Sequence, residues 1–318
     1  MPPSQAHTPS GYTLRHAERS EAPAVQAVLD AAESADTGEP RRHTTVVATY
    51  WVDPECRIER DWWVVDAPGG AIVGVAWVWP ELAGEVIADH YVDPEHRGLG
   101  LGDVLLDAIE LRVAGLPPRG PDGEPRQLVV WSEDKDATRR HSLERRGFTI
   151  GRQYFEMAFD LQGALPVVAW PDGVEGRPFR SGIDERRMHE VDVEAFAEHF
   201  LFKADAFEAW RIRHLEAPDA DPTLWRLAWD GGKLVGYVMA VGTDQGALVS
   251  NLAVLKPWRG RGLGRAMLGA AFATLRERGY AVVRLYVDAA NVTNAVRVYE
   301  AAGMHVARRF DVLQKPLA

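Results

Sequence analysis

The feature that most constrains this chain of 318 residues is a cassette that occurs twice. Each copy is an apolar run of strand length that leads into a helix through Arg-x-x-Gly-x-Gly. The first copy has its strand at 86–92 and its loop at 97–102, and the second has them at 248–254 and 259–264. Glycines at this spacing, before a helix N-terminus, leave several backbone N–H groups exposed where the helix dipole favours negative charge. The loop is therefore suited to hold a pyrophosphate.

The spacing of the glycines narrows the choice of ligand. A dinucleotide-binding loop reads Gly-x-Gly-x-x-Gly after the first strand, and a nucleoside-triphosphate loop ends in Gly-Lys-Ser/Thr. Neither loop of this chain reads so, and the first cassette follows a helix and three candidate strands. The residues resemble the signature of the GNAT superfamily of acetyltransferases, Arg/Gln-x-x-Gly-x-Gly/Ala after the fourth strand. That resemblance implies acetyl-CoA as acyl donor, with its pyrophosphate in the loop.

The order of elements is the same in the two halves, which indicates a tandem duplication. Hydrophobic patterns and turn signals predict strands or helices at 12–16, 21–32, 61–65, 72–79, 127–131, 137–146 and 154–160, and again at 174–179, 186–197, 224–229, 234–241, 282–287, 294–301 and 307–313. We expect a disordered N-terminus at 1–11, domains at 12–161 and 174–318, and a linker with glycines and prolines at 162–173. The resemblance implies an α/β fold with two tandem GNAT domains, each a mixed, mostly antiparallel twisted sheet flanked by helices.

The helices that follow the two loops carry apolar residues at spacings of four and three, which is typical of a core-facing stripe. These residues are Val104, Ala108 and Leu111 in the first half and Leu268, Phe272 and Leu275 in the second. We expect all six to be structural.

Composition and charge exclude several classes of partner. A hydrophobic content of 46% is that of a globular protein, and a net charge of -10 argues against nucleic-acid binding. The basic pairs 139–140, 145–146 and 308–309 alternate with acids, so we expect them on solvated faces. The longest apolar run, 71–79, is too short to span a bilayer. We expect a small-molecule partner, no nucleic acid, no membrane, and a monomer or homodimer.

Cysteine and histidine usage argues against a disulfide or a metal site. Cys56 is the single cysteine and has no close Cys or His partner, and the N-terminus has no signal-peptide pattern, so we expect a reducing, cytoplasmic location. Asp89, His90, Glu95 and His96 lie close in sequence, but alternation along a strand would separate the first two. We therefore expect no metal.

Residues 285–304 resemble the closing GNAT motif, with two asparagines and Tyr-Glu-x-x-Gly before an apolar residue. The resemblance implies that Asn291 hydrogen-bonds the pantetheine arm, that Asn294 lies near the phosphates, and that Tyr299 protonates the departing CoA thiolate. A phenol can donate a proton to a thiolate, whose conjugate acid has a pKa of about 8.5. The same resemblance assigns further acetyl-CoA contacts to Leu252, Val254, Arg259, Gly260, Arg261, Gly262, Leu263 and Gly264, and to Val92, Arg97, Gly98, Gly100 and Gly102 in the first half.

The first half departs from this pattern. Leu143 falls at the position of Tyr299 and Lys135 at that of Asn291, so the N-terminal domain lacks the presumed acid. We expect that domain to be degenerate for catalysis. Its loop is intact, which leaves CoA binding in a scaffolding or regulatory role open.

The general base is harder to assign, because the strand at 248–254 has no acidic residue. Ser250 or Asn251 can position a water, and Asn251 is our second candidate catalytic residue. Asp244 and His199 are other candidates for the base, or the acceptor amine has a low pKa and needs little help. Asp89 holds the position of Asn251 in the first half, which therefore keeps a possible base and loses the acid.

These features predict an acetyl-CoA-dependent N-acetyltransferase that acts by direct transfer on the primary amine of a small molecule, in the C-terminal domain. One alternative follows from the tandem arrangement, which is similar to that of the mycothiol synthase group, whose members acetylate the cysteinyl amine of a pseudodisaccharide thiol. An α-amine has a pKa of about 7.7 to 8.0, which suits a site without a strong base. A second alternative is a non-catalytic CoA-binding sensor or partner-binding protein. Tyr299 discriminates, because only an enzyme needs it.

Overall fold

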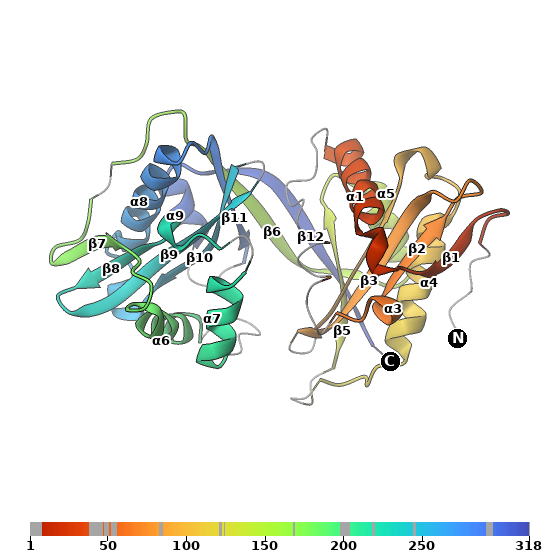
Figure 1. Ribbon diagram of the computed structural model, residues 1–318, viewed down its shortest axis with the longest axis horizontal. Coiled ribbons are helices and arrows are strands. Elements are labelled where there is room, and N and C mark those ends of the chain that lie inside the picture. The colour runs from red at the N-terminus through yellow and green to blue at the C-terminus, as the bar shows by residue number, and fades with distance from the viewer. Residues whose placement is uncertain are drawn as a thin grey trace. The chain divides into compact units, whose positions relative to one another are not determined.

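The computed structural model describes residues 8–37, 47, 51, 56–82, 85–120, 123, 125–167, 169–197, 204–217, 220–243, 246–290 and 295–317. The chain forms two compact units (Figure 1). Unit 1 comprises 1–151 and 311–318, and unit 2 comprises 152–310. The chain therefore enters unit 2 within one strand, β6 (Thr149–Asp160), and returns to unit 1 within another, β12 (His305–Pro316).

Unit 1 contains a mixed sheet with helices on both faces. Its elements are β1 (Thr13–His16), η1 (Arg19–Glu21), α1 (Ala22–Thr37), α3 (Ile58–Asp61), β2 (Trp62–Asp66), β3 (Ile72–Leu82), β4 (Glu85–Val92), η2 (Pro94–His96), α4 (Leu101–Ala114), β5 (Gln127–Glu133) and α5 (Ala137–Arg145). Strands β1 to β4 pair antiparallel, β4 and β5 pair parallel, and β12 follows β5.

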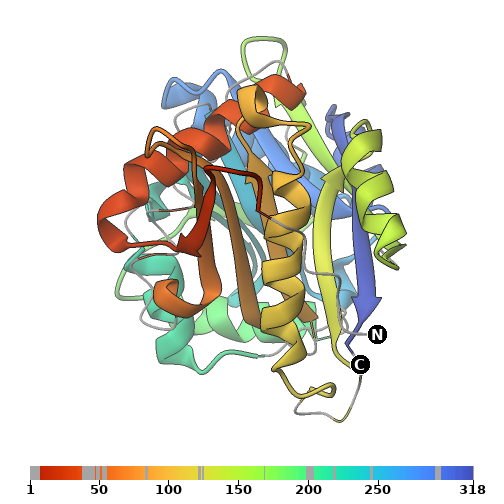
Figure 2. The ribbon, with the colours of Figure 1, turned by 90° about the vertical axis from the view of Figure 1, so that its right-hand side faces the viewer.

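Alternation along the strands of unit 1 divides its core between the two faces. Trp62 and Val64 of β2 pack in the cluster that contains α1, whereas Trp63 and Val65 pack in the cluster that contains α4. Figure 2 shows α4 packed over its face of the sheet and running alongside the strands. Both faces of the sheet are thereby buried.

Unit 2 repeats this arrangement. Its elements are β7 (Val174–Pro178), α6 (Glu185–Phe196), α7 (Phe207–Leu215), η3 (Pro222–Leu224), β8 (Arg226–Asp230), β9 (Lys233–Thr243), β10 (Gly246–Val254), η4 (Lys256–Trp258), α8 (Leu263–Glu277), β11 (Val282–Asp288) and α9 (Ala295–Ala301). Strands β7 to β10 pair antiparallel, β10 and β11 pair parallel, and β6 pairs antiparallel with β11. Helices α8 and α9 lie on one face, and α6 and α7 on the other (Figure 1). The mixed, mostly antiparallel sheets predicted from the sequence are confirmed.

The units and the predicted domain ranges divide the chain at different residues. The strand predicted at 154–160 belongs to the sheet of unit 2, where it pairs with all seven residues of β11. The end of β12 belongs to unit 1, where Leu313 is fully buried in the α4 cluster. Each unit is thus completed by a strand from the other half of the sequence. Residues 1–7 of the expected disordered N-terminus lie outside the described residues.

One residue of the predicted core stripes is misplaced. Leu268, Phe272 and Leu275 are fully buried, but Leu111 is 64% exposed. The buried stripe of α4 passes through Ile109, and two residues further along a helix is a rotation of about 200°. Leu111 therefore points away from the sheet.

Among the described residues, no helix is both long and apolar enough to cross a bilayer.

Candidate active site

Two glycines of the second loop keep its backbone open. Gly260 and Gly262 have φ values of +74° and +83°, a region that side chains with a Cβ rarely adopt. A Cβ on either would meet no heavy atom of the described residues within 4 Å. Gly264 differs, because a Cβ there would lie 3.1 Å from Cγ1 of Val298 in α9. The first two glycines therefore expose the backbone, and the third allows close packing of α8 on α9.

Positive charge gathers at the start of α8. This helix begins at Leu263, directly after the left-handed Gly262, so the N–H groups of its first turn point toward the loop. The helix dipole adds the equivalent of about half a positive charge there. Arg261 and Arg265 are exposed beside it. Backbone donors and two guanidinium groups together suit a pyrophosphate.

Arg259, the first residue of the loop signature, has a different role. Its Nε donates to the carbonyl of Val254 at 2.9 Å, and its Nη2 donates to the carbonyl of Ala195 at 3.0 Å. The side chain therefore ties the loop to β10 and to the last turn of α6. These bonds hold the loop in place, and Arg259 also lines the cavity described below.

Strands β10 and β11 separate after a short parallel contact. They pair at Ala247–Val283 and Leu248–Arg284, at the start of both strands. The pairing of β10 with β9 shifts register between Val249 and Asn251, which leaves Ser250 as the extra residue of a β-bulge. A bulge bends its strand. Residues 250–254 consequently line a cavity instead of pairing with β11.

The cavity between β10 and β11 has a volume of about 640 Å³. Its walls come from these two strands, the loop, α9, the last turn of α6 and Tyr154 of β6. The described residues that line it all belong to unit 2. Asn251, Gly262, Arg265 and Tyr299 therefore share one cavity.

Tyr299 is held in the form that a proton donor needs. Its side chain is half-buried on α9, and this burial raises the pKa of the phenol to about 12. A raised pKa keeps the hydroxyl protonated throughout the neutral range. The phenol can therefore donate a hydrogen bond or a proton into the cavity.

Asn251 is the inner end of a polar chain. Asn251 lies on the same face of β10 as Ala253, which pairs with Tyr237 of β9, and a hydrogen bond from the Asn251 side chain acts to lower the pKa of that phenol. The Tyr237 hydroxyl in turn donates to Oδ1 of Asp192 in α6. Tyr237 is 0% exposed and Asp192 is 8% exposed. Burial raises the pKa of both groups, that of Tyr237 well above its usual value. A buried carboxylate thus lies two hydrogen bonds from the cavity wall.

In unit 1 the corresponding place is filled by an arginine. Arg139, in the first turn of α5, donates from Nη1 to the carbonyl of His90 at 2.6 Å and from Nη2 to the Asp89 carboxylate. Asp89 and Arg139 each expose 13% of their side chains. By the correspondence of the two halves, Asp89 matches Asn251 and Arg139 matches Ala295. Unit 1 therefore has a long cationic side chain at the position where unit 2 has an alanine that lines its cavity.

Strand β4 also lacks the bulge of β10. Its pairing with β3 runs without a shift through Ala88–Val78 and Asp89–Trp77, at the place where β10 has Ser250 and Asn251. The strand consequently keeps its register along this stretch. The sequence gives no local signal for this difference, because both strands alternate in the same way.

The loops of the two units differ in charge. Gly98 and Gly100 keep φ values of +78° and +83°, so the backbone shape is retained. Unit 2 has three arginines over 259–265, whereas unit 1 has one arginine and one aspartate over 97–103, a change from +3 to 0. The aspartate is Asp103, the counterpart of Arg265. An anionic ligand is therefore favoured much less at the first loop.

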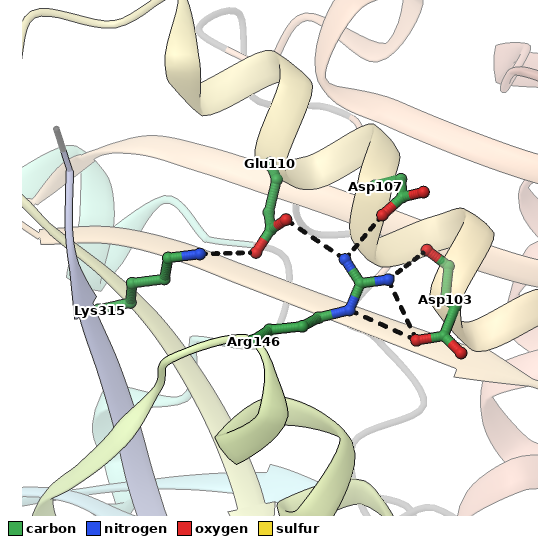
Figure 3. Close-up of polar contacts among 5 residues, drawn as sticks. All are labelled: Asp103, Asp107, Glu110, Arg146 and Lys315. Atoms are coloured by element: carbon green, nitrogen blue, oxygen red, sulfur yellow. Dashed lines mark hydrogen bonds and ion pairs between the residues drawn. The ribbon is translucent and has the colours of Figure 1, made fainter. Parts of the chain in front are cut away.

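Asp103 is part of an ion-pair cluster within unit 1 (Figure 3). Arg146 lies 3.1 Å from Asp103 Oδ1 and 2.7 Å from Asp107 Oδ1, and it also contacts Glu110 at 3.2 Å. Lys315 of β12 lies 2.9 Å from Glu110. The cluster ties α4 to the end of α5 and to the strand that returns to unit 1.

Four of the predicted site residues fall in segments that the structure does not describe. Asn291, Asn294, Asp244 and His199 lie outside the described residues. Leu143 is a fully buried core residue of unit 1, which agrees with its inability to act as an acid.

Sequence reasoning missed Asp192, Tyr237 and Arg139. One signal was available for Asp192, which holds a core position of α6 beside Met188 and Val191. An acid on an apolar stripe is costly unless it has a partner. One arginine of each basic pair was also misjudged, because Arg139, Arg146 and Arg308 expose only 13%, 18% and 14% of their side chains in ion pairs. Their partners are distant in sequence, so local alternation of charge could not reveal them.

Comparison with known proteins agrees with this geometry. The model of the acetyltransferase (GNAT) family matches residues 186–304, and that of an acetyltransferase (GNAT) domain matches 59–150. A mycothiol acetyltransferase of Catenulispora acidiphila is 30% identical over 314 residues, which cover 94% of this chain and 96% of the relative. The chain belongs to the GNAT acetyltransferase family. It is a tandem GNAT protein with a GNAT match in each half.

Two further comparisons extend over most of this GNAT chain. A mycothiol acetyltransferase of Thermobispora bispora is 33% identical over 290 residues, covering 88% of this chain and 91% of the relative. The crystal structure of a GCN5-related N-acetyltransferase from Sphaerobacter thermophilus has a TM-score of 0.84 and 29% identity, covering 98% of this chain and 97% of that one. The tandem arrangement is therefore shared along the whole length.

GNAT acetyltransferases use acetyl-CoA as acyl donor, and it is the donor for this chain. The described residues of unit 2 fit it. Gly260 and Gly262 offer exposed backbone, Arg265 brings a positive charge to the cavity, and residues 250–254 present a strand edge that does not pair with β11.

Proposed function

We propose that unit 2 transfers the acetyl group directly to the primary amine of a small molecule, and that this amine is a cysteinyl α-amine of a pseudodisaccharide, as expected for a mycothiol acetyltransferase. The observation that carries the proposal is the cavity of unit 2, which brings together the α8 loop, Asn251 and Tyr299. The relatives named mycothiol acetyltransferase, at 30% to 33% identity over nearly the whole chain, support this acceptor over other small amines.

The reaction assigns distinct tasks to the chain. The donor supplies the thioester; the amine nitrogen bonds to the acetyl carbon, the carbon–sulfur bond breaks, one proton leaves the amine and one reaches the sulfur. Tyr299, protonated at neutral pH, is the proposed source of the second proton. Asn251 accepts a hydrogen bond from the amine and orients it. The loop over 260–265 holds the pyrophosphate.

The absence of a strong base on β10 favours an amine of low pKa. Asp288 is the carboxylate among the described residues that line the cavity, but it already lies 3.1 Å from Arg152 and accepts from the N–H of Ala290 at 2.8 Å. At pH 7.5, about a third of an α-amine is neutral, against about 0.1% of a lysine-type amine. An α-amine therefore reacts with little help from the protein.

Transfer is proposed for unit 2 alone. Unit 1 has Leu143 in place of the acid, Asp103 in place of Arg265, and Arg139 across the strand that would carry the pantetheine contact at Val92. Gly98 and Gly100 keep the left-handed backbone of the loop, but the net charge over 97–103 is zero and Arg139 bonds the neighbouring strand β4. We infer that acetyl-CoA binds through the loop at 259–264 and not through that at 97–102.

The proposal is tested by mass spectrometry of acetyl transfer from acetyl-CoA to a panel of amines. The panel contains the cysteinyl pseudodisaccharide, its S-blocked form, a polyamine, an aminoglycoside and a lysine peptide. We expect N-acetylation of the pseudodisaccharide, and of its S-blocked form, at the highest kcat/KM. Acetylation of another amine alone would replace the acceptor, and acetyl-CoA binding without transfer to any amine would favour the sensor hypothesis.

A further inference from the structure

The chain of hydrogen bonds behind Asn251 has a fixed direction. The Tyr237 hydroxyl has one proton, and it donates that proton to the Asp192 carboxylate. Its oxygen can then only accept from Asn251, and an amide donates through nitrogen. The amide nitrogen of Asn251 therefore faces Tyr237. The carbonyl oxygen of that amide is directed away from Tyr237, toward the cavity that Asn251 lines.

Unit 1 shows that the fold does not require these polar groups. Arg97 and Arg259 bond the carbonyls of Ala32 and Ala195, which aligns α1 with α6 and matches Leu29 to Asp192. Strand pairing likewise matches Val75 to Tyr237, because Val75 pairs with Tyr91 as Tyr237 pairs with Ala253. Leu29 and Val75 are fully buried and share one apolar cluster. Unit 2 thus buries a carboxylate and a hydroxyl where apolar side chains suffice for packing.

Burying a carboxylate costs free energy of desolvation, and hydrogen bonds to the buried group offset that cost only in part. A structural explanation would have the pair stabilise unit 2, but the apolar pair of unit 1 does this without desolvating a charge. A functional explanation needs a group that the pair orients, and Asn251 on the cavity wall is such a group. The substrate amine must present its nitrogen lone pair to the acetyl carbon. Its N–H groups therefore need protein groups at defined places that accept hydrogen bonds from them.

We infer that Asp192 and Tyr237 are positioning residues, which fix the amide of Asn251 so that its oxygen accepts an N–H of the acceptor amine. Asn251 is the group that touches the substrate. This inference rests on the proposed function of unit 2 and adds to it the part of the protein that orients the acceptor. Asp192 and Tyr237 have no role in binding acetyl-CoA.

The test replaces the polar pair by an apolar one of similar size, Asp192→Leu/Tyr237→Phe, as a counterpart of Leu29 and Val75. Replacing both partners removes the buried carboxylate together with the hydroxyl that pairs with it, and the freed N–H of Asn251 borders the cavity, where water can accept from it. The melting temperature should therefore stay near that of the wild type. We expect kcat/KM for the amine to fall about 10-fold, and about 10²-fold in Asn251→Ala. The Kd of acetyl-CoA, measured by calorimetry, should change less than twofold in both.

The decisive variant combines all three substitutions. If the pair acts through Asn251, its removal costs nothing further once Asn251 is alanine, so the triple variant should match Asn251→Ala. Tyr12→Phe, which removes the hydroxyl that bonds His96 in unit 1 at 2.8 Å, is the control for loss of a hydroxyl elsewhere. Multiplied losses in the triple variant, or unchanged kcat/KM in the folded pair variant, would overturn the inference while leaving the proposed function intact. A wild type that transfers to no amine would overturn both.

Discussion

The contrast between Arg139 in unit 1 and Ala295 in unit 2 predicts how many acetyl-CoA molecules the chain binds. Wild type should bind one. Replacing Asp89 and Arg139 by the residues that unit 2 has at these places, Asp89→Asn/Arg139→Ala, should open the cleft of unit 1 and add a second, weaker site. It should be weaker because the loop at 97–103 has no net charge, whereas that at 259–265 has three positive charges.

The structure also gives the expected cost of each change. Arg139→Ala alone leaves the Asp89 carboxylate, 13% exposed, without its cation, which costs about 3 to 5 kcal/mol. Asp89 still accepts from the N–H of His90 at 2.8 Å and from the Tyr91 hydroxyl at 3.0 Å, so the lower end of that range is expected. The double variant removes the charge as well and should cost about 1 to 3 kcal/mol, for the bond to the His90 carbonyl.

Calorimetric titration with acetyl-CoA measures the stoichiometry, and denaturant unfolding measures the stability of each variant. Two sites of similar affinity in the wild type would refute the claim that Arg139 excludes the ligand from unit 1. A folded double variant that still binds one molecule would show that the loop charge, and not Arg139, is decisive.

Three further predictions concern the acid, the loop and the exchanged strand. The pKa of Tyr299 is raised to about 12, so the acid stays protonated across the neutral range. We therefore expect kcat/KM to rise as the amine loses its proton and to show no falling limb below pH 10. A falling limb near pH 8 to 9 that Tyr299→Phe abolishes would contradict this. Gly262→Val should weaken acetyl-CoA binding at least 10-fold in calorimetry. Gly100→Val is the control, because Gly100 has the same φ of +83° as Gly262 and the substitution causes the same strain, and we expect it to leave binding unchanged. Equal effects of the two variants would argue against a loop role specific to unit 2. Leu313→Ala should lower the free energy of unfolding of unit 1 by about 2 to 5 kcal/mol in denaturant unfolding, with acetyl-CoA affinity unchanged in the folded protein. A decrease below about 1 kcal/mol would mean that β12 contributes little to that core.

The parts of the fold that are written in local patterns were predictable. The cassette at 248–254 and 259–264 becomes β10, a loop with two left-handed glycines, and α8 beginning at Leu263. Strand alternation, glycine spacing and helical periodicity are properties of short segments, so one sequence reveals them.

The destination of the last strands was not predictable in the same way. Residues 154–160 and 307–313 alternate as strands whichever sheet they join, and nothing in that pattern names the partner strand. The exchange of β6 and β12 between units is decided by long-range packing, such as burial of Leu313 in unit 1.

The site divides along the same line. The loop, Tyr299 and Asn251 could be proposed from the sequence because they lie in or beside contiguous signatures. The contacts of Asn251 with Tyr237 and Asp192 could not, because these residues come from α6, β9 and β10 and meet only in the folded unit. Arg139 was placed on a solvated face because its partners, Asp89 and the His90 carbonyl, lie about fifty residues away in sequence.

We propose Tyr299, in the cavity of unit 2, as the acid of an acetyl transfer. The most direct test is single-turnover acetylation of the cysteinyl pseudodisaccharide by Tyr299→Phe and wild type, with acetyl-CoA affinity measured by calorimetry on the same samples. We predict a rate about 10² lower with the affinity unchanged, because phenylalanine keeps the ring and removes only the proton donor. A rate equal to that of wild type would contradict the claim.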